Sequence, residues 1–181
     1  MTQSEIIRRP PPPEGMAQLE LVIEDADGTV IGREFEQFPS LLHHRPNARL
    51  GDLPPMPPLG LLGGILITIP TVGHNKFATD IGALTGWQMA LGIGTAAELA
   101  ADTTLSSEIT TYGLARVSVT PTILNNVVTW SHKWTATTGA SFMVAEFGLI
   151  KDTILMMRHK VSATKLIVST QHVTATITDT L

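Results

Sequence analysis

Residues 127–149, VVTWSHKWTATTGASFMVAEFGL, decide the fold of this chain. Side chains alternate between the two faces of a β-strand, which puts four of them on one face: Val128, Trp130, His132 and Trp134. Thr137, Thr138 and Gly139 interrupt the alternation, and a second alternating segment follows at 141–149. The stretch predicts two strands joined as a β-hairpin or a close relative of one, with both tryptophans in the core.

Alternating segments of the same kind recur along the chain. Residues 18–24 and 29–38 flank Asp27-Gly28, a tight-turn pair, which predicts another hairpin. Further strands are predicted at 64–71, 87–93, 114–120, 153–161 and 172–178, with a helical turn or two at 96–101 and a short element at 105–109. Short, regularly spaced, threonine-rich strands predict an antiparallel, jelly-roll-like β-sandwich over residues 17–181. Its expected core contains Val117, Val119, Val128, Trp130, Trp134, Phe142, Phe147, Leu149, Val173 and Ile177.

Two proline-rich segments are expected to stand apart from these strands. Residues 1–16 contain four consecutive prolines, Pro10, Pro11, Pro12 and Pro13, and such a run favours the extended polyproline II conformation. We therefore predict an extended N-terminal arm that becomes ordered by docking on a partner. Residues 39–63 are so rich in proline that no regular element is expected, which predicts a long irregular loop within the domain.

The composition limits the classes of partner. Only 15% of the 181 residues are charged and 43% are hydrophobic, so a partner chain is expected to cover part of the surface. The net charge of −4 argues against nucleic acid as a partner. The apolar run 59–72 is interrupted by glycine and proline and is shorter than the ~20 residues of a membrane helix, so no membrane span is expected. The lack of cysteine excludes disulfides and thiolate chemistry.

Three patterns resemble catalytic or cofactor motifs and fail in detail. Residues 92–97 match the dinucleotide pattern GxGxxA, but the helical segment that follows is too short for a crossover between parallel strands. Residues 25–36 have the length of a calcium loop, but Val30 stands at the sixth position, where glycine is required. Ser141 lacks the second glycine of a nucleophile elbow, because Met143 stands there.

The histidines and tryptophans are better explained by packing than by binding. His43 and His44 are adjacent on an irregular loop, and such neighbours rarely converge on one metal ion without outside ligands. His132 shares its face with two tryptophans, which favours a packed histidine. With few aromatic residues and no acid pair at an interpretable spacing, a sugar site or a glycosidase is not favoured. We expect no catalytic residue, no cofactor and no metal ion.

Several segments together resemble a recurring type of virion structural protein from tailed bacteriophages: 91–109 (LGIGTAAELAADTTLSSEI), 114–136, 144–150 (VAEFGLI), 156–165 (MMRHKVSATK) and 172–180 (HVTATITDT). In that family a GxGT segment precedes a D..L..EI element. A strand pair, an EFGL-type strand, an m..R strand and a threonine-rich terminal strand follow. The resemblance covers residues 88–180, and the segment VIEDADGTVI is similar to the family's opening hairpin. The turn at 150–152 is shorter than is usual in the family, and Ser169-Thr170-Gln171 replaces its Gly-Asp.

The resemblance implies a non-enzymatic protein of the virus particle, assembled in the host cytoplasm. We expect a capsid decoration, or cement, protein that bridges shell subunits, with the major capsid protein as partner. Its arm would bind through Arg8, Arg9 and the four prolines. A homotrimer is expected, in which Leu59, Leu61 and Leu62 of the 39–63 loop lie between subunits. The alternative is a tail-fibre or receptor-binding module that contacts the host surface.

Overall fold

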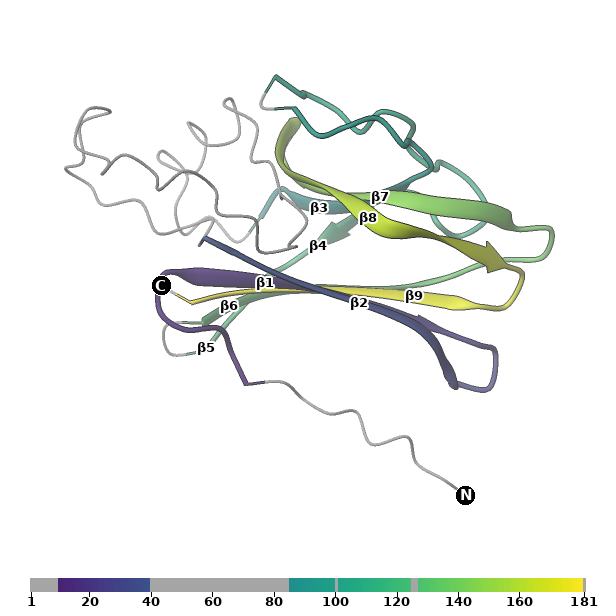
Figure 1. The fold of residues 1–181 in the computed structure, drawn as a ribbon, viewed down its shortest axis with the longest axis horizontal. Helices are drawn as coiled ribbons and strands as arrows, with labels where there is room; N and C mark the ends of the chain where they lie inside the picture. Colours follow the sequence, from purple (N-terminus) through teal and green to yellow (C-terminus); the bar gives the residue numbers. More distant parts are fainter. Residues whose placement is uncertain (1–9, 40–84, 100, 125–126, 181) are drawn as a thin grey trace.

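The structure, a computed structural model, describes residues 10–39, 85–99, 101–124 and 127–180. Two antiparallel β-sheets pack face to face (Figure 1). The first sheet has the strand order β2-β1-β9-β6-β5 and the second the order β4-β3-β7-β8. The predicted antiparallel β-sandwich is confirmed. Across the described ranges, no helix is long and apolar enough to cross a bilayer.

The strands follow the alternating segments of the sequence. The first sheet contains β1 (Met16–Glu24), β2 (Val30–Pro39), β5 (Thr122–Leu124), β6 (Val127–Thr135) and β9 (His172–Thr180). The second contains β3 (Trp87–Gly92), β4 (Val117–Val119), β7 (Ser141–Lys151) and β8 (Ile154–Val168). β1 and β2 form the predicted hairpin, and Gly28 has a φ of 85° in its turn, a conformation that glycine adopts without strain.

The predicted hairpin between residues 127–136 and 141–149 is wrong. β6 pairs with β5 and β9, whereas β7 pairs with β3 and β8, so the two strands belong to different sheets. The link between them crosses the sandwich, and Ala136 N–H donates to the Gln171 carbonyl at 2.9 Å at the start of the crossing. Because both strands carry an apolar face, the crossing lets those faces meet across the core.

The tryptophan face of β6 is buried, as predicted. Trp130 is 1% exposed and packs against Trp87 of β3, with ring centroids 5.0 Å apart. Trp134 is 2% exposed, and its indole N–H donates to the Ala115 carbonyl at 2.9 Å. The other predicted core residues belong to the same cluster, in which Val117 and Phe142 are only partly buried.

Several predicted elements end elsewhere. The strand predicted at 114–120 is reduced to β4, and the strand predicted at 153–161 continues to Val168. Residues 96–99 form no helical turn, and Glu108 makes only an isolated bridge to Gly92. The strand predicted at 64–71, the loop residues 40–63 and most of the arm lie outside the described residues.

We predict that Trp134→Ala lowers the free energy of unfolding by ~3–5 kcal/mol, because it empties a buried aromatic site and removes the donor to the Ala115 carbonyl. Denaturant unfolding measures the change. The control is Lys133→Ala on the opposite, exposed face of the same strand, where loss of the surface ion pair with Glu24 should cost at most ~1 kcal/mol. Equal stability of the two variants would contradict the core assignment.

Candidate functional site

A buried ion pair joins β7 and β8 on the outer side of the second sheet. The Oε2 atom of Glu146 lies 2.8 Å from Nε of Arg158, and the two side chains are 0% and 2% exposed. The segment between β3 and β4 runs over this side of the sheet and covers the pair (Figure 1). We call residues 93–109 of that segment the cover loop.

The Glu146 carboxylate holds the cover loop through backbone donors. It accepts from the N–H groups of Ser107 at 2.7 Å, Ser106 at 3.1 Å and Gly94 at 3.2 Å. The Ser106 hydroxyl lies 3.2 and 3.3 Å from its two oxygens. A charged acceptor that is removed from water requires such donors, and both oxygens of Glu146 have them.

Arg158 completes the network from the β8 side. Its Nη1 atom donates to Asp102 at 2.6 Å and to the Ala97 carbonyl at 3.2 Å, and Nη2 donates to the Ala96 carbonyl at 3.2 Å. Asp102 also accepts from the N–H of Leu99 at 2.9 Å. The guanidinium therefore binds one carboxylate in the sheet and another in the cover loop, and it fixes the loop backbone between them.

In the contact between Arg158 and Asp102, hydrogen bonds and opposite charge affect the pKa of each group more than burial does. Burial by itself would lower the pKa of Arg158, but its hydrogen bonds to Asp102 and Glu146 raise that pKa instead. Burial would likewise raise the pKa of Asp102, yet the Leu99 N–H and the Arg158 guanidinium lower it. Both groups are therefore held in their charged forms.

Two glycines of the sequence pattern are explained by close approach to this network. A Cβ atom at Gly94 would collide with the Ser106 hydroxyl and the Glu146 carboxylate. A Cβ atom at Gly148 would lie 2.9 Å from a methyl group of Leu105, through which the cover loop packs on Ala90, Ile150 and Leu155 of the sheet. The network thus brings together four of the resembling segments: GxGT, D..L..EI, EFGL and the strand that carries Arg158. Their polar groups are used to fasten a loop.

A second charged cluster closes one side of the sandwich, where the edge strands β2 and β8 face each other. His159 of β8 is fully buried, and its Nε2 atom lies 3.0 Å from Oε1 of Glu34 in β2. The same oxygen accepts from the Ser162 N–H at 2.7 Å, and Glu98 of the cover loop accepts from the Lys160 N–H. We call this side, defined by Glu34, Glu98 and His159, the seam.

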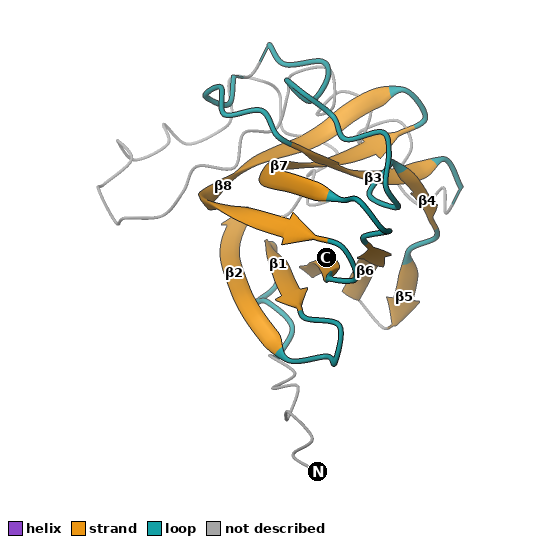
Figure 2. Ribbon diagram, turned by 90° about the vertical axis from the view of Figure 1, so that its right-hand side faces the viewer, coloured by secondary structure: helices purple, strands orange, loops and turns teal. Residues whose placement is uncertain are grey.

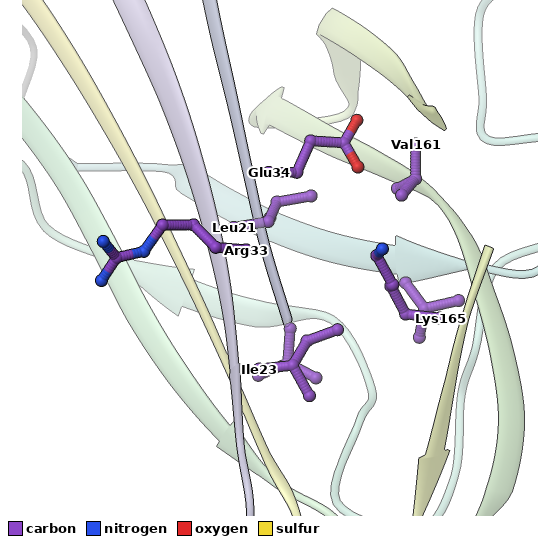
Figure 3. Close-up of a pocket in the computed structure, with 8 residues that line it drawn as sticks. Leu21, Ile23, Arg33, Glu34, Val161 and Lys165 are labelled. Carbon is purple, nitrogen blue, oxygen red and sulfur yellow. The ribbon is translucent and has the colours of Figure 1, made fainter. Parts of the chain in front are cut away.

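The seam offers little room for a ligand. A small cavity beside it, with about 10 Å³ available to water, is enough for roughly one water molecule. Figure 3 shows Glu34, Val161 and Lys165 on its two sides, while the guanidinium of Arg33 points away. Within the described ranges, no group of three or more acidic or histidine side chains is placed to hold a metal ion. The seam is an internal contact between the two sheets.

Most of the residues singled out from the sequence fall outside the part of the chain that the structure describes. Arg8, Arg9, His43, His44, Leu59, Leu61 and Leu62 lie outside the described residues. At the base of the arm Pro12 is buried, and the exposed residues are Pro10, Pro11 and Pro13. His132 packs edge-on against Trp134, with ring centroids 4.7 Å apart, and burial lowers its pKa.

The residues that form the network were missed from the sequence, although a signal was present. Glu146 interrupts the apolar run VAEFGLI, and Arg158 interrupts ILMMRHKV. A charge that breaks an apolar run requires a partner when both faces of the strand are covered. Pairing these two charges would have predicted the contact between β7 and β8.

We predict that Glu146→Gln and Arg158→Met each lower the free energy of unfolding by ~3–5 kcal/mol, because each leaves a buried charge without its partner. The double variant should cost clearly less than the sum, and denaturant unfolding of all four proteins gives the coupling. The matched control is the surface pair Arg116 and Glu108, where Arg116→Met should cost ~0–1 kcal/mol. Additive effects at 146 and 158 would contradict direct coupling.

A second prediction concerns the pH dependence of the seam. Burial would raise the pKa of Glu34, but the hydrogen bonds from His159 and Ser162 lower it below the ordinary value. Glu34 therefore contributes stability at neutral pH that is lost as the pH falls through and below about 4.3. We expect Glu34→Gln to be less stable than the parent at neutral pH and to lose less stability between about pH 5 and about pH 3.

Glu36 provides the comparison, because its pKa is shifted the other way. Burial and the neighbouring charges of Glu34 and Glu98 raise it, so the folded state disfavours the charged form. Glu36→Gln should therefore be more stable than the parent at neutral pH. Urea unfolding across the same pH series measures both variants, and effects of the same sign at neutral pH would contradict the assignment.

Comparison of the chain with protein-family models, curated proteins and solved structures finds no match.

Proposed function

We propose that this chain is a virion structural protein of a tailed bacteriophage that decorates the capsid and stabilises the head by bridging shell subunits. The observation that carries the proposal is the internal use of the resembling segments. Their charged groups, Asp102, Glu146 and Arg158, bind one another and the cover loop backbone. Such a network fixes the conformation of the cover loop and therefore the shape of the protein surface. A protein that acts by covering other subunits depends on a surface of fixed shape.

The arm supplies the bridging contact in this proposal. Its base is fixed to the first sheet, where Gly15 N–H donates to the Thr180 carbonyl at 3.0 Å and Met16 N–H donates to the Pro13 carbonyl at 3.0 Å. Residues 1–9 can span roughly 30 Å when extended. Arg8 and Arg9 bind an acidic surface of the major capsid protein. Docking costs little backbone entropy because the prolines have already lost that freedom.

A homotrimer completes the proposal. Leu59, Leu61 and Leu62 belong to an apolar stretch of the 39–63 loop, and contact with the next subunit would cover it. Cyclic symmetry gives each loop one neighbour and closes the assembly.

One observation favours the alternative, a tail-fibre or receptor-binding module. Polar side chains form a row in register across the outer face of the first sheet: Thr122, Thr129, Thr178, Gln18 and Gln37. In the next row the hydroxyls of Ser131 and Thr176 lie 2.9 Å apart. Apart from Gln18, which is buried, these hydroxyl and amide groups offer hydrogen bonds to a host glycan.

Imaging of particles distinguishes the two functions. We expect gold-labelled antibody against this protein to lie over the heads of purified particles in negative stain. Label confined to the tail or its tip would favour the alternative. Particles without label would contradict both.

The arm contact is tested on heads that lack the protein. We predict that the double substitution Arg8→Glu and Arg9→Glu weakens binding to such heads by about tenfold or more, since each lost ion pair contributes ~1 kcal/mol. The double substitution to lysine keeps the charges and is the matched control. Co-sedimentation measures occupancy, and equal occupancy of the two variants would exclude the arginine contact.

A further inference from the structure

Strand β5 leaves one edge of the first sheet open. Within the described part of the chain β5 pairs with β6 alone. Its Ile123 is 51% exposed and its Leu124 is 74% exposed, the highest value for a large hydrophobic side chain in the described ranges. An unpaired edge with apolar side chains is a template for another strand.

The edges on the opposite side of the sandwich are protected. The β8 N–H groups of Lys160 and Ser162 donate to carboxylates of Glu98 and Glu34. β2 carries charges along its length, including Arg33 and Glu36. Charge and capping of this kind prevent edge-to-edge association. β5 has no charge, no proline and no bulge.

The apolar side chains at this edge define what can pair with it. Leu124 is the cross-strand neighbour of Val127, and Ile123 is that of Val128. Consecutive residues point to opposite faces of a sheet, so a third strand that extends both apolar rows needs two consecutive apolar residues. Ile6-Ile7, in the segment TQSEIIRR before the prolines, is such a pair.

The arm begins at the correct end of the sheet. Gly15 is bonded to Thr180 of β9, and the cross-strand series Thr180, Val127, Leu124 leads from there to the open edge. The described part of the arm leaves the first sheet on its outer side (Figure 1), and its stiff prolines do not favour a turn back to the edge of the same subunit. The sequence match and the path of the arm together favour the edge of a neighbouring copy.

We propose that residues 4–8, centred on Ile6-Ile7, add as a strand to the free edge of β5 in a second copy of this chain. Each copy then gives one arm and receives another. The contact is heterologous, so copies related by cyclic symmetry close into a ring. This association does not depend on the virus particle, and its test is separate from the imaging and co-sedimentation experiments on particles.

The test uses light scattering with size-exclusion chromatography on the full chain at micromolar concentrations. Two variants are compared with the parent: Ile6→Asp with Ile7→Asp in the arm, and Leu124→Asp in the edge. The matched controls are Thr2→Asp with Gln3→Asp in the arm, outside the proposed strand, and Leu166→Asp, whose side chain is 53% exposed on β8. Far-UV circular dichroism verifies that each variant is folded.

We expect the parent and both controls to form an oligomer, and both test variants to be monomers with an apparent dissociation constant raised at least tenfold. A mixture of the arm variant with the edge variant should regain a dimer, because one supplies an intact edge and the other an intact arm. A monomeric parent would overturn the proposal. An oligomeric arm variant would also overturn it and would indicate pairing of two β5 edges. A mixture that stays monomeric would overturn it as well.

Discussion

The outer side of the second sheet depends on one contact, the buried ion pair of Glu146 and Arg158. A carboxylate and a guanidinium can be removed from water only when their hydrogen-bonding groups are satisfied. Here Glu146 receives the N–H groups of the cover loop, and Arg158 donates to its carbonyls and to Asp102. The described residues of the loop form no helix or strand apart from the isolated bridge of Glu108, so these bonds decide its conformation. Removal of one partner leaves the other charge buried and uncompensated, whereas replacement of both by apolar side chains is often nearly neutral.

At the seam, buried polar side chains likewise require hydrogen-bond partners, and here the partners come from the two different sheets. β2 and β8 are edge strands of different sheets, and His159 with Glu34 joins them by side chains where no backbone ladder exists. Glu98 brings the cover loop to the same strand, one residue from His159. Arg158 and His159 are consecutive, so β8 presents one charged contact to the cover loop and the next to the first sheet. One strand thereby couples the loop, the second sheet and the first (Figure 2).

Alternation was sufficient to predict the sandwich and most of its core, because one face of β6 and β9 is apolar and the other polar. It failed for the pairing of β6 and β7, since a short link with turn residues is compatible both with a hairpin and with a crossing between sheets. The pair of Glu146 and Arg158 left a signal in the sequence, but the contact of Arg158 with Asp102 could not be predicted, because those two residues are 56 positions apart. The glycines at 92 and 94 were considered only as part of a dinucleotide pattern that fails. The structure explains Gly94 by the close approach of Ser106 and Glu146, which only the fold brings together.

Native-state hydrogen exchange of the backbone amides of Gly94, Ser106 and Ser107 tests the role of the Glu146–Arg158 pair most directly. These N–H groups lie in an irregular loop, two of them in residues with exposed surface, and without the carboxylate they would exchange like those of other surface loops. If Glu146 and Arg158 fix the cover loop, the three loop amides are protected from exchange nearly as strongly as the core amides of β7. Glu146→Gln then abolishes the protection of the loop amides, while the β7 amides stay protected. Rapid exchange of the three amides in the parent protein, or protection that survives Glu146→Gln, would contradict this role.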